Sequence, residues 1–306
     1  MPNLRQLEYL VAIADTLHFR RAAERTNTTQ PTLSEQLKAL EDRLGVQLVE
    51  RSRSRVVMTP IGDQIVDIAR RMLSDAAEIR MLAASGGREL SGLLRLGLPP
   101  TIGPYLLPQV LPALHRSYPT LKLYVRENLP EDLPRFLDDG RLDVLLTLLP
   151  LQQGDFTSIP LFREPLFLTV GADHPFAART SVRKDELKGM DILTLGPGHQ
   201  LHDAVLSLCL EFGARLRHDF EGTSLDTLRE MVVMGLGATF LPGLYVQREI
   251  ITDSSLKTLQ IEGRSMHRTI GMVWRKTSAR QHDYQRLAEF IRKSARETFP
   301  ILAPAG

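Results

Sequence analysis

The side chains best suited to chemistry in this chain gather in one short stretch, from Gly196 to Cys209. Within it, His199, Gln200 and His202 carry imidazole and amide groups, which can donate and accept hydrogen bonds to a polar ligand. Cys209 is the single cysteine of the 306 residues. One cysteine excludes an intramolecular disulfide and any metal site built on several cysteines, so this stretch is suited to binding or to the chemistry of one thiol.

A metal site is the alternative use of His199, His202 and Asp203, because histidines three residues apart can lie on one face of a helix. The Gly-Pro-Gly loop at 196–198 argues against a regular helix at His199, and no further cluster of ligands follows nearby in the sequence. We therefore expect no metal and no cofactor.

Two further stretches would bring hydroxyl groups to such a ligand. Thr101 follows a predicted strand, and Thr223 and Ser224 precede a predicted helix. At both helix starts, the free backbone N–H groups and the positive end of the helix dipole favour an anion or a carboxylate. The alternative is that these hydroxyls only cap their helices, which is the more frequent use of Ser and Thr there.

A different kind of chemistry is expected between Phe19 and Gly45, where the sequence predicts two helices and a tight turn. The second helix begins after Thr29, and its leucines at 33, 37, 40 and 44 form a core stripe that leaves short polar groups on the opposite side. This is helix-turn-helix geometry, in which the second helix enters the major groove of DNA. The alternative is an ordinary surface hairpin of two helices. The predicted DNA-contacting residues of this helix are Gln30, Pro31, Thr32, Ser34, Glu35 and Lys38.

The flanking residues favour the DNA-binding interpretation. An amphipathic helix predicted from Leu4 to Ala14 closes a three-helix core. Residues 48–59 have the pattern of two short strands around a turn, a wing whose arginines contact phosphates without reading sequence. Residues 1–60 hold nine Lys or Arg against seven acids. Five of these acids can point away from DNA, namely Glu8, Asp15, Glu24, Glu41 and Asp42. The predicted phosphate contacts of the wing are Arg51, Arg53 and Arg55.

A helix of more than twenty residues is predicted over 60–84, with Ile65, Ile68, Met72 and Ile79 at helical spacing. So long a helix cannot bury its apolar stripe within a small N-terminal domain of residues 1–59, so pairing with a second copy of the chain is expected. The alternative is that the stripe packs on the C-terminal domain of the same chain. A flexible hinge is expected over 85–92, which is rich in Gly and Ser.

From residue 93 to residue 306, predicted strands and helices alternate, which indicates an α/β domain. Two similar halves are expected, lobe I over about 93–162 and 266–300 and lobe II over about 163–265. A cleft between them would lie where strand ends meet helix starts. The predicted strands are Leu93–Leu98, Leu121–Glu127, Leu142–Leu149, Leu166–Val170, Ile192–Leu195, Ala238–Leu241 and Met266–Trp274.

The run from Arg5 to Thr59, with FRRAAER, TQPTLSEQLKALEDRLG and LVERS, resembles the winged helix-turn-helix of LysR-type transcriptional regulators. Residues 97–108, 223–229 and 268–275 resemble most the peroxide-sensing OxyR branch of that family. The resemblance implies a cytoplasmic homodimer or homotetramer on a double-stranded DNA operator, with RNA polymerase as a possible further partner. It also implies that residues 93–306 form a two-lobed effector domain, like a periplasmic binding protein, with a small-molecule effector in the cleft.

The resemblance raises Thr101 and Thr223 as effector-site residues, beside the loop residues His199, Gln200 and His202. Pro130 and Arg268 complete the predicted effector site, because they align with positions of the OxyR branch. The alternative for Arg268 is a merely structural role.

The chain departs from that branch at two of these positions. In the branch, a peroxidatic cysteine comes just after the loop histidine, with a second cysteine nine residues later. Here Gln200 takes the first place and Cys209 the second, and Pro130 replaces a threonine thought to help hold peroxide. We therefore expect control by a small effector rather than by a cysteine disulfide. The alternative is a peroxide sensor that works through Cys209 alone.

Composition and motifs weigh against other classes of protein. The sequence contains no G-x-S-x-G elbow, no P-loop and no dinucleotide fingerprint after the first strand of the α/β region, which argues against an α/β enzyme. No signal-peptide pattern is present at the N-terminus, which argues against an exported solute-binding protein and favours the cytoplasm. No uninterrupted apolar run approaches the roughly 18 residues of a membrane span.

Overall fold

The chain divides into two units, Met1–Arg88 with Asp138–Arg141, and Glu89–Leu137 with Leu142–Gly306. The computed structural model describes residues 2–51, 56–85, 90–151 and 154–305. The predicted wing residues Arg53 and Arg55, and residues 86–89 of the predicted hinge, lie outside the described residues.

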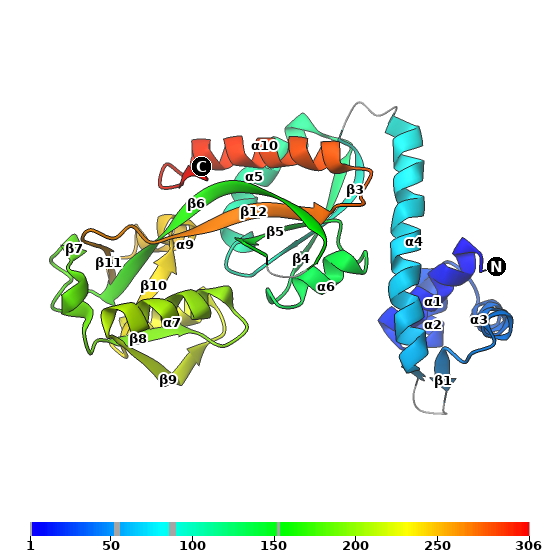
Figure 1. Cartoon of the computed structure of the whole chain (residues 1–306), viewed down its shortest axis with the longest axis horizontal. Helices are drawn as coiled ribbons and strands as arrows, with labels where there is room; N and C mark the ends of the chain where they lie inside the picture. Colours follow the sequence, from blue (N-terminus) through cyan, green and yellow to red (C-terminus); the bar gives the residue numbers. More distant parts are fainter. Residues whose placement is uncertain (1, 52–55, 86–89, 152–153, 306) are drawn as a thin grey trace. The chain divides into compact units, whose positions relative to one another are not determined.

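The first unit contains the predicted helix-turn-helix and a two-stranded wing (Figure 1). The helix that follows the turn begins where Thr29 accepts a hydrogen bond from the Thr32 backbone N–H, and it ends at Gly45, whose φ of 72° is left-handed. Leu33, Leu37 and Leu40 are each 0% exposed, and the fourth leucine of the predicted stripe, Leu44, is half-buried against the same core. The elements are α1 Leu4–Thr16, α2 Phe19–Arg25, α3 Gln30–Leu44, β1 Val49–Arg51, β2 Val56–Met58 and α4 Pro60–Ser85.

The long helix α4 is attached to α1 by a partly buried ion pair. Arg70 Nη2 lies 2.6 Å from Asp15 Oδ1, and the Arg70 side chain is only 9% exposed. Val66 and Ala69 are buried on the same unit. Among the side chains of α4 that the structure describes, four large apolar ones are exposed. These four follow each other at intervals of seven, four and seven residues, the spacing of a coiled-coil seam. They are Ile61, Ile68, Met72 and Ile79.

The second unit consists of two halves with the same strand order. In one half the order is β4-β3-β5-β12 and in the other it is β9-β8-β10-β6, with the first three strands parallel in each. The predicted α/β class and two-lobed plan are confirmed. The bounds are β3 Gly92–Leu98, β4 Leu121–Glu127, β5 Val144–Leu149, β12 His267–Arg275, β8 Asp191–Leu195, β9 Arg215–Gly222, β10 Ala238–Pro242 and β6 Phe156–Gly171.

Strand β6 runs through both halves (Figure 1). Its first part pairs with β12 and its last part pairs with β10 and β11 (Leu256–Ile261). The sequence predicted only Leu166–Val170, because Pro160 and Pro165 interrupt the donor ladder and argue against a strand before that point. Strand β9 was also missed, since its alternating charges resemble a solvated loop.

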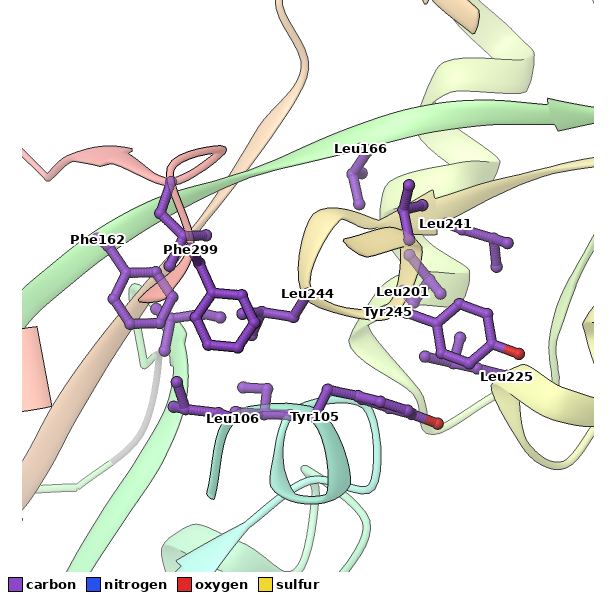
Figure 2. Packing of buried hydrophobic residues seen from close by; sticks show 14 of the residues in the cluster. Tyr105, Leu106, Phe162, Leu166, Leu201, Leu225, Leu241, Leu244, Tyr245 and Phe299 are labelled. Carbon is purple, nitrogen blue, oxygen red and sulfur yellow. The ribbon is translucent and has the colours of Figure 1, made fainter. Parts of the chain in front are cut away.

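Helices cover the strands and close a large apolar core, part of which is drawn in Figure 2. A smaller, separate apolar cluster lies around α6 and includes Leu133, Phe136 and Val273. Helices α5 and α10 pack against each other in the first half, and α7 packs on β8 in the second. No helix among the described residues is long and apolar enough to cross a membrane. The remaining elements are α5 Gly103–Ser117, α6 Leu133–Asp138, β7 Ser181–Val182, η1 Lys184–Leu187, α7 Gln200–Phe212, α8 Leu225–Val233, α9 Gly243–Tyr245, η2 Val246–Ile250, α10 Gln281–Thr298 and β13 Ala303–Pro304.

Candidate nucleic-acid interface and ligand cavity

One face of α3 carries the polar residues that were predicted from the sequence to contact DNA. Gln30, Thr32, Glu35 and Lys38 are exposed, as is Pro31, while Ser34 is half-buried. The buried leucine stripe fixes the rotation of the helix, so these side chains are presented together. Their amide, hydroxyl and ammonium groups are those that pair with base edges and phosphates in a major groove.

The wing is held against α3 by Glu41. One carboxylate oxygen of Glu41 accepts hydrogen bonds from the backbone N–H groups of Leu48 at 2.8 Å and Val49 at 3.1 Å. Nothing in the sequence predicted a contact for Glu41, and the structure adds this specific one. Charge-assisted bonds of this kind set the position of the wing strand relative to the helix.

Arg51 is the one predicted wing arginine that lies within the described residues. Its guanidinium stacks over the Phe19 ring, with Cζ 4.1 Å from the ring centroid, and the residue is exposed. This stacking contact uses no N–H donor, so the group is oriented while its donors can still bind a phosphate. Arg51 also borders a surface hollow that it shares with Ser34, Glu35 and Lys38.

A cavity of about 380 Å³ lies in the second unit, at the carboxyl ends of strands from both halves. Thr101 follows β3, Glu127 ends β4, His199 follows β8 and Thr223 follows β9. Ligands of α/β proteins bind at this edge because loops and helix N-termini converge there. The lining residues are Pro100, Thr101, Pro104, Tyr105, Glu127, Leu195, His199, Thr223, Ser224, Leu225, Asp226 and Glu249.

Arg268 does not line this cavity, contrary to the prediction that it is an effector contact. Its Nε donates to Glu164 Oε2 at 2.6 Å, and the two side chains are 4% and 0% exposed. Its terminal nitrogens donate to the hydroxyl of Thr101 at 3.2 Å and to the carbonyl of Thr101 at 3.0 Å. Glu164 also accepts from the backbone N–H of Leu244 at 2.8 Å. Arg268 therefore positions Thr101 from behind the cavity wall.

The two predicted hydroxyl sites have different uses. Ser224 Oγ accepts a hydrogen bond from the Thr227 backbone N–H at 3.1 Å, so it caps α8. Thr223 lies just before this cap and is exposed in the cavity. Thr101 lines the cavity too, although its hydroxyl already accepts from Arg268.

Of the three predicted loop residues, only His199 lines the cavity. Its side chain is 8% exposed, and its Nδ1 has no hydrogen-bond partner among the described residues. Burial is the main cause that lowers the pKa of His199, and the nearby His202 lowers it further, so the ring is kept neutral. The carboxylate of Glu131 opposes this shift.

The other predicted residues lie elsewhere. His202 Nδ1 is 2.9 Å from the carbonyl of Leu195, which can only accept, so this nitrogen carries the proton and ties α7 to the end of β8. Gln200 begins α7, and its Oε1 is buried without a hydrogen-bond partner among the described residues. Pro130 is buried. None of the three is among the cavity-lining residues.

Sequence reasoning missed the acidic side chains of the cavity, Glu127, Asp226 and Glu249. Glu127 is the last residue of a strand that was predicted, so its place at a strand end was a signal that could have found it. Asp226 lies in the first turn of α8, while Glu249 comes from the short element η2, for which the sequence carries no signal. Partial burial raises the pKa of Glu127.

Cys209 is buried on α7, as its apolar neighbours predicted. It is 3% exposed and shares its face with Val205, Leu208 and Phe212, which are also buried. Burial raises the pKa of the Cys209 thiol from 9.0 to about 11, so the thiol is neutral near pH 7. In the part of the chain that the structure describes, no group of three or more His, Cys, Asp or Glu is placed to hold a metal ion.

Family models match both units of the chain. Residues 4–63 match the bacterial regulatory helix-turn-helix protein, lysR family, and residues 87–296 match the LysR substrate binding domain. The DNA-binding transcriptional dual regulator OxyR of Escherichia coli is 43% identical over 292 residues, which cover 95% of each chain.

The chain is also similar to solved structures of OxyR proteins. Full-length OxyR from Pseudomonas aeruginosa, with a cysteine-to-aspartate substitution, is 38% identical with a TM-score of 0.78, over 95% of this chain and 97% of that one. The hydrogen-peroxide-bound cysteine-to-serine mutant of Corynebacterium glutamicum OxyR is 35% identical with a TM-score of 0.68, over 98% and 96% of the two chains.

Proposed function

Because this chain belongs to the LysR family of transcriptional regulators and is OxyR-like, we propose that it binds a DNA operator as a homodimer or homotetramer and answers to a small effector rather than to a disulfide. The family consists of regulators, so the enzyme and solute-binding alternatives are set aside. The effector would bind in the cavity at the strand ends and bias one arrangement of the assembly over another.

The proposal of a small effector in place of a disulfide depends on one observation, the burial of Cys209, which is the single cysteine of the chain. A disulfide switch needs an accessible, activated thiolate and a second thiol that resolves the sulfenic acid. Cys209 is buried with a raised pKa, and Gln200 stands where the OxyR branch has its peroxidatic cysteine. The hydrogen peroxide in the structure of the Corynebacterium glutamicum relative is a ligand of that protein.

Two features of the first unit support the DNA-binding and oligomeric parts. The exposed polar face of α3 and the oriented Arg51 suit a major groove and its flanking phosphates. The exposed apolar stripe Ile61, Ile68, Met72 and Ile79 has the spacing that a second copy of α4 would cover.

The test compares operator occupancy before and after hydrogen peroxide. DNase footprinting of the full chain on duplex DNA should give the same footprint in both conditions, for the parent protein and for Cys209→Ser. Intact-mass spectrometry of the same samples reports whether Cys209 has oxidised. A footprint that shifts at low peroxide in the parent protein and stays fixed in Cys209→Ser would establish the one-cysteine peroxide sensor instead.

A further inference from the structure

The cavity at the carboxyl ends of the strands has an acidic lining. Glu127, Asp226 and Glu249 line it, and its described lining residues include neither Lys nor Arg. Tyr105 lines the same cavity, and its pKa is raised first by burial and then by the negative charges of Asp226, Glu249 and Glu127. A cavity with this charge attracts cations and disfavours the anions that the helix starts had suggested.

Two of these carboxylates have identified neighbours. Asp226 Oδ1 accepts a hydrogen bond from the hydroxyl of Tyr245 at 2.9 Å. The carboxylate of Glu127 lies against the first residue of α5, because a Cβ on Gly103 would be only 2.4 Å from Glu127 Oε1. The positive end of α5 therefore already faces a carboxylate of the chain itself. A carboxylate ligand at that helix end would meet a like charge.

The aromatic side of the cavity is equally well ordered. The rings of Tyr105 and Tyr245 meet edge to face, with centroids 5.0 Å apart and planes at 87°. Figure 2 shows both phenolic oxygens on the same side of the pair, next to Leu225. A tyrosine ring beside carboxylates is the surrounding in which proteins hold ammonium groups, through the negative face of the ring.

His199 is an independent sign that a ligand belongs here. The residue is more than nine-tenths buried, it lines the cavity, and its Nδ1 has no partner among the described residues. Buried polar atoms are almost always hydrogen-bonded, because an unpaired one loses its water without compensation. The neutral ring can give or take one hydrogen bond at this atom, which a polar ligand would supply.

We propose that the cavity binds a small organic cation, a molecule with a protonated amine or guanidinium group beside a neutral hydrogen-bonding part. Glu127, Asp226 and Glu249 balance its charge, the Tyr105 ring contacts its cationic end, and His199 and Thr223 bond its neutral part. The volume of about 380 Å³ is that of a site for a small organic molecule. This inference rests on the proposed function only in that the cation would be the effector.

Isothermal titration calorimetry on the full chain tests the inference with four probes. Agmatine and 1,4-diaminobutane carry two positive charges, glutarate is a dianion of similar length, and magnesium chloride supplies a divalent metal. We expect saturable binding of the two amines and none of glutarate or magnesium. Glu127→Gln and Glu249→Gln should each weaken agmatine binding by about tenfold. Glu289→Gln, which removes an exposed carboxylate from α10, is the matched control and should bind agmatine like the parent.

Three results would overturn the inference: no saturable binding of either amine, saturable binding of glutarate, or binding of magnesium alone that the cavity substitutions abolish. Thermal unfolding of each variant verifies that it is folded. Duplex binding is measured on the same samples, so that a failure of the proposed function can be distinguished from a failure of the cationic-ligand proposal. If the chain binds the amines but no duplex, only the proposed function is contradicted. If it binds the duplex but neither amine, only the proposal of a cationic ligand is contradicted.

Discussion

Arg268 and Glu164 are direct cross-strand partners on β12 and β6, and they form a 2.6 Å ion pair from which water is almost excluded. Both carry further hydrogen bonds, Arg268 to Thr101 and Glu164 to the backbone of Leu244. The pair thus joins four separate segments at the strands that run between the two halves. Burying two charges costs free energy because both groups lose their hydration. The hydrogen bonds that satisfy both side chains offset this cost in the core.

Removing one member of this pair should destabilise the protein strongly. Arg268→Met leaves Glu164 buried without a countercharge, so we expect the free energy of unfolding to fall by about 3–5 kcal/mol. Urea unfolding followed by tryptophan fluorescence measures this, because Trp274 is buried on the same strand. Adding Glu164→Leu should recover part of the loss. Lys293→Gln, which breaks an exposed pair with Glu297, should change little, and an equally small loss for Arg268→Met would contradict the role assigned to the pair.

A substitution on the polar face of α3 and a substitution in the wing should change DNA binding in different ways. Gln30→Ala should cost about 1–3 kcal/mol on the specific operator and little on random duplex, because a base contact carries sequence information. Arg51→Ala should weaken binding to both duplexes alike, because a phosphate contact carries no sequence information. It should also reduce the slope of log K against log salt concentration by about one unit. Fluorescence anisotropy over a series of salt concentrations measures both effects. Arg116→Ala, an exposed arginine of α5, is the control, and equal losses on both duplexes for Gln30→Ala would exclude base readout.

Cys209 should react slowly with alkylating agents at neutral pH. Only the thiolate reacts, and a pKa of about 11 instead of 9.0 lowers the thiolate fraction near pH 7 by about 100-fold, one factor of ten for each of two units. The iodoacetamide reaction followed by mass spectrometry should therefore accelerate as the pH rises toward 11. The same protein in urea provides the reference for an unburied thiol. Native-state alkylation at pH 7 as fast as in urea would mean that Cys209 is accessible.

Gly103 should be required for the position of Glu127. An added Cβ would lie 2.4 Å from Glu127 Oε1 and 3.0 Å from Leu98 Cδ1, so Gly103→Ala should push the Glu127 carboxylate away from the start of α5. Because the displaced atom ends a flexible side chain, the melting temperature should change little. The pKa of Glu127, now raised by partial burial, should change, because the carboxylate leaves both its partly buried position and the positive end of α5. Carboxyl carbon NMR over a pH series measures this, and an unchanged pKa would contradict the predicted displacement.

The second unit should fold without the first. Its apolar core is a cluster separate from the core of the helix-turn-helix, so deleting residues 1–88 removes no core side chain from it. We expect a fragment of residues 89–306 with native-like circular dichroism, with the same amine binding as the full chain and without duplex binding. A fragment that is unfolded by circular dichroism would contradict this boundary.

Local features of this protein were determined by the sequence alone. The limits of α3 follow from the Thr29 cap, the leucine stripe and Gly45, which all act within fifteen residues of helix. The burial of Cys209 follows in the same way from the apolar face of α7. In both cases the information lies in helical spacing, which needs no knowledge of the rest of the fold.

The charge of the cavity was decided only by the tertiary structure. Glu127, Asp226 and Glu249 come from three elements that the strand order brings to one edge, and the order depends on pairing between distant segments. Arg268 was predicted to face a ligand, but Glu164, 104 residues away in the sequence, lies opposite it and neutralises it. Electrostatic interactions act through space, so the partner of a charged residue is set by the packing of strands and cannot be read from its neighbours along the chain.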